Sequence, residues 1–201
     1  MNFIFPLLAY LLGSIPFGLL LARVFGYGDI RKIGSGNIGA TNVLRTGNKK
    51  LAVLTLLLDI GKGGLAVWLS FISQDMWIIF SSALLVVLGH MYPVWLKFKG
   101  GKGVATALGA FLVLLPPLGV AMMILWLIAA IIFRISSLAA LIAFAAAPVL
   151  SVLWLQDENV MLLSGGIAAL VFWKHRENIK RLMKGEEPKI SVGKNGKSAP
   201  T

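Results

Sequence analysis

The sequence contains no cysteine and few acidic residues. Without cysteine, the chain cannot form disulfides, use a thiolate as nucleophile or bind a metal through sulfur. Only 8 of the 201 residues are Asp or Glu, whereas 19 are Lys or Arg, which gives a net charge of +11. Because the few carboxylates are scattered along the chain, we expect no metal ion and no other cofactor.

Long polar stretches are also scarce. Hydrophobic residues make up 58% of the chain, and the mean hydropathy is +0.85. This composition predicts an all-α integral membrane protein with one membrane domain and no soluble module. We predict seven spans, although the fourth and the last are shorter than the roughly 17–25 residues that a span usually needs. They cover residues 2–25, 51–73, 77–95, 104–116, 117–134, 137–155 and 159–173.

The fourth and fifth spans are separated at Pro116 and Pro117. A continuous helix over residues 104–133 would be about 45 Å long, more than the hydrocarbon core of about 30 Å. Two prolines in the middle of the stretch favour a turn there.

Basic residues lie on alternate connections, which predicts the orientation of the chain. Excess Lys and Arg mark cytoplasmic loops, so we place the N-terminus outside and the C-terminus in the cytosol. The predicted outer turns contain Asp75, Asp157 and Glu158 and no cation. Because the cations border apolar segments, anionic lipid or small anionic substrates are better partners than nucleic acid.

Lys62 is the one cation well inside a predicted span, since Arg23 and Arg134 lie at the ends of theirs. It follows Asp59 by three residues, so the two share a helix face. A local ion pair near the cytosolic end of the span is the interpretation that we favour, and a functional intramembrane pair is the alternative.

The first polar motif, GSGNIGATNVLR, spans residues 34–45. A helix that begins near Asn37 would place Asn37, Thr41 and Arg45 on one face, with free N–H groups and a guanidinium available to bind phosphate. The alternative is an interfacial helix capped by Ser35 or Asn37. The density of polar residues beside lipid favours a binding function. The candidates in this motif are Gly34, Ser35, Gly36, Asn37, Thr41, Asn42 and Arg45.

The second motif, GHMYPVWLKFKGGKG, spans residues 89–103. Its glycines can form a backbone nest around Lys102, and a helix that begins at Val104 would direct its positive end to the same point. The motif lacks the first Gly and the Ser or Thr of a Walker A loop, so it predicts phosphate binding without nucleotide hydrolysis. The candidates are Lys97, Gly100, Gly101, Lys102 and Gly103.

His90, in the same motif, has three interpretations. It could act as a general base, pack as a hydrogen-bonded residue or donate to a phosphate. Many membrane acyltransferases have a His followed by four residues and an Asp, but Val94 and Trp95 stand at the corresponding positions here. We therefore include His90 among the substrate-binding candidates.

The third motif, KHRENIKRLMKGEE, spans residues 174–187. His175 and Asn178 are neighbours on one face of a helix. An interfacial basic helix that binds anionic lipid is the alternative, and it explains the cations but not His175 or Asn178.

In order and spacing, the three motifs resemble those of the bacterial membrane glycerol-3-phosphate acyltransferases that use acyl phosphate as donor, the PlsY family. The resemblance covers nearly the whole chain and is most specific in SGNIGATNVLR and GHMYPVWLKFKGGKGVAT. It implies transfer of a fatty acyl group from acyl phosphate to the 1-hydroxyl of glycerol 3-phosphate, which gives lysophosphatidic acid and phosphate. It also implies a bacterial inner-membrane protein whose active site faces the cytosol.

The resemblance also implies roles for individual residues. Ser35 and Arg45 correspond to the functional residues of the first motif. Acyl-phosphate binding falls to the second motif, and His175, Asn178 and Glu187 correspond to the functional residues of the third, with Glu186 as an alternative to Glu187. We predict Ser35, Arg45, His175 and Asn178 as catalytic. The predicted substrate-binding set is Gly34, Gly36, Asn37, Thr41, Asn42, His90, Lys97, Gly100, Gly101, Lys102, Gly103 and Glu187.

Two substrates with phosphate groups need two anion sites, and the chain offers two motifs that combine glycines with a cation. An acyl phosphate already carries a good leaving group, so positioning and charge stabilisation matter more than a strong base. We therefore predict direct attack by the glycerol hydroxyl, without an acyl-enzyme at Ser35. The phosphate of the acceptor substrate is our candidate for accepting the proton.

We divide the chain into a single transmembrane acyltransferase domain, 1–187, and a flexible polar tail, 188–201. A membrane transporter of small organic anions is the main alternative, because the first span is interrupted at residues 13–16. A scaffold that anchors to anionic lipid is a third interpretation. Polar residues crowd one side of the predicted membrane, which favours the enzyme.

Overall fold

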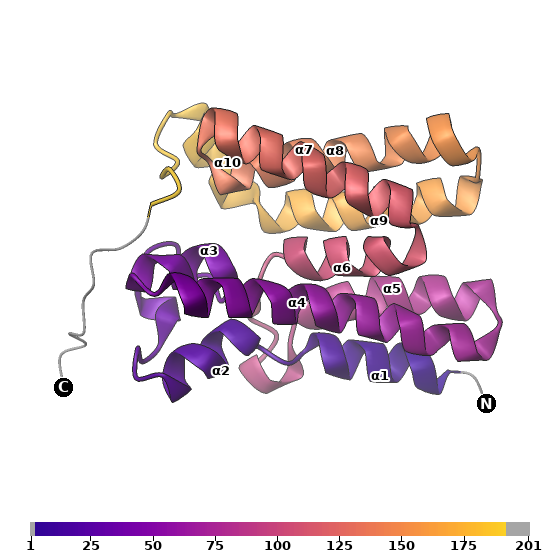
Figure 1. Ribbon diagram of the computed structural model, residues 1–201, viewed down its shortest axis with the longest axis horizontal. Helices are drawn as coiled ribbons and strands as arrows, with labels where there is room; N and C mark the ends of the chain where they lie inside the picture. Colours follow the sequence, from indigo (N-terminus) through magenta and orange to yellow (C-terminus); the bar gives the residue numbers. More distant parts are fainter. Residues whose placement is uncertain (1–2, 192–201) are drawn as a thin grey trace.

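The computed structural model describes residues 3–191, and these contain helices but no strand. The long helices run side by side in two layers, with a short helix between them (Figure 1). One layer contains α1 (Ile4–Gly13), α4 (Lys49–Ser70) and α5 (Met76–Met91). The other contains α7 (Pro116–Phe133), α8 (Ser136–Leu155) and α9 (Glu158–Lys174), and α6 (Val104–Leu114) lies between the layers.

Three shorter helices gather at the end of the molecule opposite the N-terminus (Figure 1). They are α2 (Phe17–Val24), α3 (Ala40–Val43) and α10 (Arg176–Met183). Four 3₁₀ turns complete the described helices, at Ile30–Lys32, Leu44–Thr46, Phe71–Ser73 and Val94–Leu96.

The all-helical prediction is confirmed for the described residues. Four helical segments, Lys49–Ser73, Met76–Leu96, Pro116–Phe133 and Ser136–Trp154, are long and apolar enough to cross a membrane, and α1 with α2 makes a fifth if the bent pair is one span. The predicted spans 104–116 and 159–173 correspond to α6, with 11 residues, and α9, with 17 residues. α6 is short for a full crossing, and α9 reaches the lower limit of the usual range.

Local signals in the sequence explain several helix ends. The side chains of Asn48, Asp75 and Asp157 accept hydrogen bonds from backbone N–H groups in the first turns of α4, α5 and α9. Pro116 occupies the first position of α7, where its missing N–H costs nothing. The predicted break between residues 104–116 and 117–134 therefore lies where α6 ends and α7 begins.

The first predicted span, 2–25, is not one straight helix. α1 ends at Gly13, α2 begins at Phe17, and the two axes differ by 41°. Pro16 lacks an N–H group and disfavours helical geometry at Ile15, so the helix breaks there. The break leaves the carbonyl of Ile15 without a helical partner four residues on, and it accepts from the N–H of Phe17 at 3.1 Å and from Lys62.

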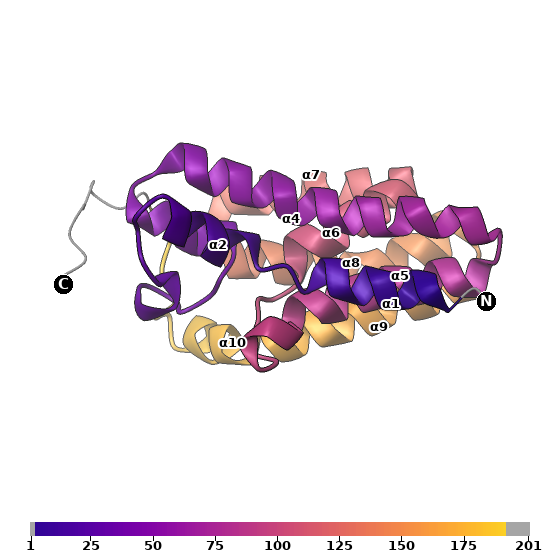
Figure 2. The same cartoon turned by 90° about the horizontal axis from the view of Figure 1, so that it is seen from below.

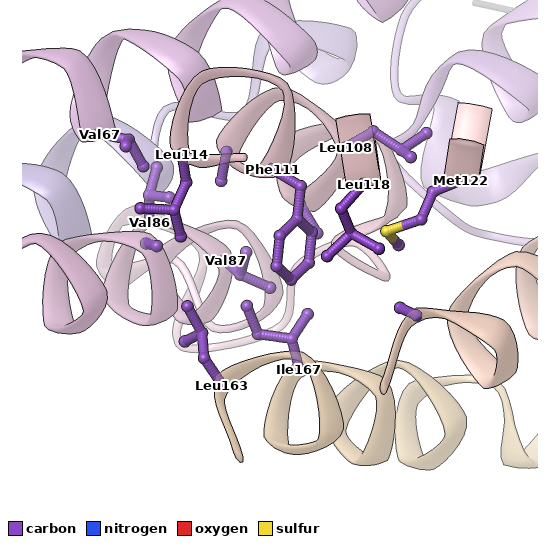
Figure 3. Packing of buried hydrophobic residues seen from close by; sticks show 14 of the residues in the cluster. Val67, Val86, Val87, Leu108, Phe111, Leu114, Leu118, Met122, Leu163 and Ile167 are labelled. Carbon is purple, nitrogen blue, oxygen red and sulfur yellow. The ribbon is translucent and has the colours of Figure 1, made fainter. Parts of the chain in front are cut away.

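The largest group of buried apolar side chains joins the two layers. The ring of Phe111, on α6, lies among Val87, Leu118 and Ile167, which come from α5, α7 and α9 (Figure 3). Phe111 is 1% exposed, so truncating it would leave a cavity at the centre of the molecule.

A buried charge cluster connects α4 to its neighbours. Lys62 Nζ lies 2.8 Å from Asp59 Oδ1, 2.9 Å from His90 Nδ1 and 2.8 Å from the carbonyl oxygen of Ile15. The predicted ion pair is therefore present. Our expectation that it lies near the cytosolic end was wrong, because Asp59 and Lys62 occupy the middle of α4, where α1 breaks and α5 packs.

α4 and α6 approach so closely that their contact requires glycine. A Cβ atom on Gly109 would lie 1.9 Å from the carbonyl oxygen of Ile60, and one on Gly63 would lie 2.0 Å from that of Thr106. Small residues allow such backbone contact between membrane helices.

We expect Gly109→Ala to destabilise the protein by about 1–3 kcal/mol or more, because the new methyl group must push α4 and α6 apart. Gly165→Ala, in α9, is the matched control, since nothing lies within 4 Å of its added Cβ. Thermal unfolding in detergent should show a lower Tm for the first variant and an unchanged or higher Tm for the second. Equal Tm values would contradict the close packing.

Candidate active site

The three polar motifs meet at the end of the molecule that carries α2, α3 and α10 (Figures 1 and 2). A cavity of about 740 Å³ lies between them, and we call it the amphipathic cavity. Predicted site residues from all three motifs line it: Ser35, Asn37, Thr41, Asn42, Arg45, His90, Lys102, Gly103, His175, Asn178 and Glu187.

The first motif is less helical than the sequence suggested. α3 begins at Ala40, not near Asn37, and Gly39 stands at its N-cap position instead of Ser35 or Asn37. Both interpretations of the helix start were therefore wrong. The reason is Asn42, whose amide nitrogen donates to the carbonyls of Ile30, Ile33 and Asn37 and holds the segment before α3 as a loop.

The amide oxygen of Asn42 also positions Ser35 and Arg45. Its Oδ1 accepts from the backbone N of Ser35 at 3.1 Å and lies 3.4 Å from Arg45 Nη1. Gly34 lies directly beneath the guanidinium, since a Cβ there would be 2.4 Å from Arg45 Nη1, and its φ of +54° suits glycine. The first motif thus brings Ser35 and Arg45 to the cavity.

The predicted backbone nest of the second motif is not formed as expected. The N–H groups of Gly100 and Gly101 donate to the carbonyls of Met91 and His90, so they are not available to an anion. Two other features of this motif face the amphipathic cavity. They are the side chain of Lys102 and the first residues of α6, whose N–H groups begin the helix.

His90 lies behind the second motif. Its Nδ1 is bonded to Lys62, and a Cβ on Gly101 would lie 2.1 Å from its Nε2. Only glycine can therefore pass over the imidazole at this point. This geometry supports the packing interpretation of His90, which supports the loop that leads to Lys102.

The third motif completes a polar network. Lys102 Nζ lies 2.5 Å from Asn178 Oδ1, and Asn178 Nδ2 lies 2.5 Å from Glu187 Oε1. Ser137 donates to Glu187 Oε1 at 2.7 Å, and Arg181 donates to Glu187 Oε2 at 2.7 Å. Of the two carboxylates left open by the sequence, Glu187 faces the cavity and Glu186 is exposed.

The titratable groups of the site are shifted by burial and by one another. Burial lowers the pKa of Lys102 to about 8, and nearby Glu187 opposes this shift. Burial, together with the charge of Lys102, lowers the pKa of His175 to about 4, so the imidazole is neutral at pH 7. Although burial opposes ionisation of Glu187, its hydrogen bonds from Ser137, Asn178 and Arg181 hold its pKa below the usual range.

The tautomer of His175 follows from one contact. Its Nδ1 lies 2.8 Å from the carbonyl oxygen of Val171, which can only accept, so Nδ1 carries the proton. Nε2 of the neutral ring then offers a lone pair to a hydroxyl donor.

The other part of the amphipathic cavity is apolar. Side chains from α4, α6 and α7 line it, and several are substantially exposed at the molecular surface. The exposed ones are Val53, Leu56, Met123, Ile124 and Leu127, whereas Leu108 is buried. The cavity therefore joins a cationic end to an apolar groove that opens on the side of the molecule.

Five predicted site residues do not line this cavity. Gly34 and Gly101 lie behind it, and Lys97 is exposed. Gly36 and Gly100 line a different cavity. Residues 188–191 of the predicted tail run along the site, where Pro188 and Ile190 line the amphipathic cavity, and residues 192–201 lie outside the described part.

Sequence reasoning missed three residues of the site. Ser137 and Arg181 bind Glu187, and Ser136 Oγ lies 3.1 Å from Thr41 Oγ1. The paired serines at the start of an otherwise apolar helix were the available signal. Within residues 3–191, no group of three His, Asp or Glu side chains is placed to hold a metal ion.

Comparison with known proteins gives one consistent result. The family model described as glycerol-3-phosphate acyltransferase matches residues 3–185. A protein named glycerol-3-phosphate acyltransferase from Paramagnetospirillum magneticum is 53% identical over 189 residues, which cover 94% of each chain. A protein of the same name from Caulobacter vibrioides is 54% identical over 193 residues, which cover 95% of this chain and 88% of the relative.

Two solved structures have the same fold. Both are of PlsY (YgiH), an integral membrane glycerol 3-phosphate acyltransferase. The glycerol 3-phosphate form has a TM-score of 0.89 at 41% identity and covers 94% of this chain and 96% of that one. The lysophosphatidic acid form has a TM-score of 0.87 at 39% identity and covers 95% and 96%.

We expect Asn42→Ala to loosen the first motif, because it leaves three carbonyls and the Ser35 N–H without a side-chain partner. The loss should be about 1–3 kcal/mol, measured as a lower Tm in detergent. Limited trypsin digestion should also cleave faster after Arg31 and Lys32. Asn159→Ala, at the exposed start of α9, is the control, and equal behaviour of the two variants would contradict this role of Asn42.

Proposed function

The chain belongs to the glycerol-3-phosphate acyltransferase family, and we propose that it transfers a fatty acyl group from acyl phosphate to the sn-1 hydroxyl of glycerol 3-phosphate. The products are lysophosphatidic acid and inorganic phosphate. The observation that carries the proposal is the amphipathic cavity, whose cationic end suits phosphate and whose apolar groove suits a fatty acyl chain. The comparisons do not favour the transporter alternative.

The cationic end of the cavity can hold two phosphate-bearing substrates. Arg45 offers a planar fork that matches phosphate, and Lys102 with the start of α6 offers a second set of donors. Arg45 and Lys102 come from different motifs. The cavity therefore offers two anion sites, one for each phosphate-bearing substrate. Asn178 holds Lys102 in place and is itself held by Glu187.

In the proposed reaction, the sn-1 oxygen of glycerol 3-phosphate attacks the carbonyl carbon of acyl phosphate. A carbon–oxygen bond forms, the bond to the phosphate oxygen breaks, and inorganic phosphate leaves. Neutral His175 can accept a hydrogen bond from the attacking hydroxyl through Nε2 and so orient it. Lys102 and Arg45 offset the charge that develops on the phosphoryl oxygens.

The proton of the hydroxyl goes to the phosphate of glycerol 3-phosphate. The second pKa of a phosphate monoester is about 6, whereas that of His175 is about 4. The substrate phosphate is thus the stronger base of the two, by about 100-fold in the equilibrium constant. Ser35 lies on the cavity wall, and we keep it as a catalytic candidate that forms no acyl-enzyme.

We further propose the orientation expected from the charges. The chain would have seven spans, with α6 and α9 as short ones, and the active site would face the cytosol of a bacterial inner membrane. The turns that carry Asp75 and Asp157 lie at the same end as the N-terminus, whereas the segments around α3 and α10 lie at the other end and the connection from α5 to α6 lies between the two ends (Figure 1). This division supports the positive-inside assignment.

Phosphate release from acyl phosphate, measured with glycerol 3-phosphate and purified protein in detergent, tests the function. Arg45→Ala and Asn178→Ala should each lower kcat by about 100-fold or more, because each removes charge stabilisation or its support. Lys50→Ala and Asn159→Ala are matched controls that should retain activity, since both side chains are exposed and neither lines the cavity.

Two results would count against this mechanism. Activity of the Arg45 and Asn178 variants equal to that of the controls would remove the assigned site. An acyl group found on Ser35 by mass spectrometry after rapid quenching would exclude direct attack.

The activity should also depend on the protonation of Lys102. Its pKa is lowered to about 8, so the side chain is charged below that pH and loses its charge as the pH rises through it. We expect kcat/KM to fall above about pH 8, where the substrate phosphate no longer titrates. In Lys102→Arg, which stays charged, the fall should move to higher pH. An unchanged profile would mean that another group causes it.

A further inference from the structure

A second cavity, of about 470 Å³, lies on the other side of the three motifs, and we call it the basic cavity. Four cationic side chains line it, Arg31, Lys99, Lys174 and Arg176, and no carboxylate does. Figure 2 shows α10, which begins at Arg176, beside the segment that follows α5 and carries Lys99. Nothing in the proposed acyl transfer uses this cavity.

Most of the positive charge in the basic cavity is not balanced by a close carboxylate. Arg31 is paired with Asp29 through its Nε at 2.9 Å. Lys174 instead donates to the carbonyl of Met91 at 3.0 Å, and Arg176 donates to the carbonyl of Trp173 at 3.2 Å.

The nearest carboxylate to Arg176 is Glu177, 3.9 Å from its Nε and largely exposed. Lys99 is itself exposed. Because these cations line one cavity, an anion that enters it is attracted by all of them.

Aromatic side chains surround the cations. Lys174 Nζ lies 4.5 Å from the centre of the Tyr92 ring, and the Arg176 guanidinium lies 5.1 Å from that of Trp173. Trp173 is 61% exposed and Phe98 is 58% exposed, although both are large and apolar. Trp173 lies at the end of the apolar helix α9, and an exposed Trp in that position marks the headgroup level of a membrane.

The basic cavity shares its walls with the amphipathic cavity. In the first motif, Gly36 lines the basic cavity, while its neighbours Ser35 and Asn37 line the other. In the third motif, His175 faces the amphipathic cavity, while the residues on either side of it face the basic one. The two cavities are therefore distinct sites separated by one layer of chain.

We propose that the basic cavity binds the phosphate of an anionic phospholipid from the adjoining leaflet. The unbalanced cations select the phosphate and the net negative charge. The exposed aromatic rings place the cavity at the depth of lipid headgroups, which favours a lipid over a phosphate free in solution. This assignment does not depend on the chemistry of the other cavity.

Native mass spectrometry of protein released from nanodiscs of equal phosphatidylglycerol and phosphatidylcholine tests the proposal. The unmodified chain should retain phosphatidylglycerol in preference. In the double variant Lys99→Ala/Arg176→Ala, this preference should fall roughly 30-fold, if each basic residue contributes about fivefold at a lipid surface. Lys50→Ala/Lys184→Ala removes the same charge from two exposed positions outside both cavities and should keep the preference.

Equal retention by the two double variants would overturn the proposal. The single variant Lys99→Ala guards against misfolding, because its side chain is exposed, and it should show an intermediate loss. Inorganic phosphate added at millimolar concentration should leave the lipid bound. If it displaces the phosphatidylglycerol, the cavity binds a free anion and the lipid assignment fails.

Discussion

The ion pair between Asp59 and Lys62, buried in an apolar helix bundle, is the interaction on which the arrangement of the site depends. A single charge at that depth would cost several kcal/mol, so each group requires the other. Lys62 also binds the carbonyl of Ile15, at the break before α2, and the imidazole of His90. Because His90 in turn supports Gly101, the position of Lys102 depends on charges in the interior of the bundle.

The site holds several cationic side chains close together, with few carboxylates to balance their charge. Glu187 is the central acceptor, since it binds Arg181 directly and Lys102 through Asn178. Burial is the main cause of the lowered pKa of Lys102, and the positive charges of Arg181, Arg45 and Lys174 lower it further. A site that already holds excess positive charge before its substrates arrive is suited to bind anions, and the substrates complete its charge balance.

Much of the fold could be predicted from the sequence because its signals are local. Apolar runs give the helices, Pro116 and the capping residues give their ends, and the one-sided cations indicate which motifs meet. Two features could not be predicted: the residue at which α3 begins, and the carbonyls to which the N–H groups of Gly100 and Gly101 donate. Both depend on partners, Asn42 and the carbonyls of residues 90 and 91, that only the folded chain brings into place. Ser137 belongs to no motif, and Arg181 lies in the third motif among other cations, so only the structure shows that both bind Glu187.

The apolar groove opens sideways between α4 and α7, through side chains such as Val53 and Ile124 that are about half exposed. A reactant that enters by this route arrives by diffusion in two dimensions. Its effective concentration is its mole fraction in the bilayer, not its amount per litre of solution. If inert lipid is added while the total amount of reactant stays constant, the mole fraction of the reactant in the bilayer falls. Reaction rates of this protein should therefore be compared at a stated ratio of reactant to lipid.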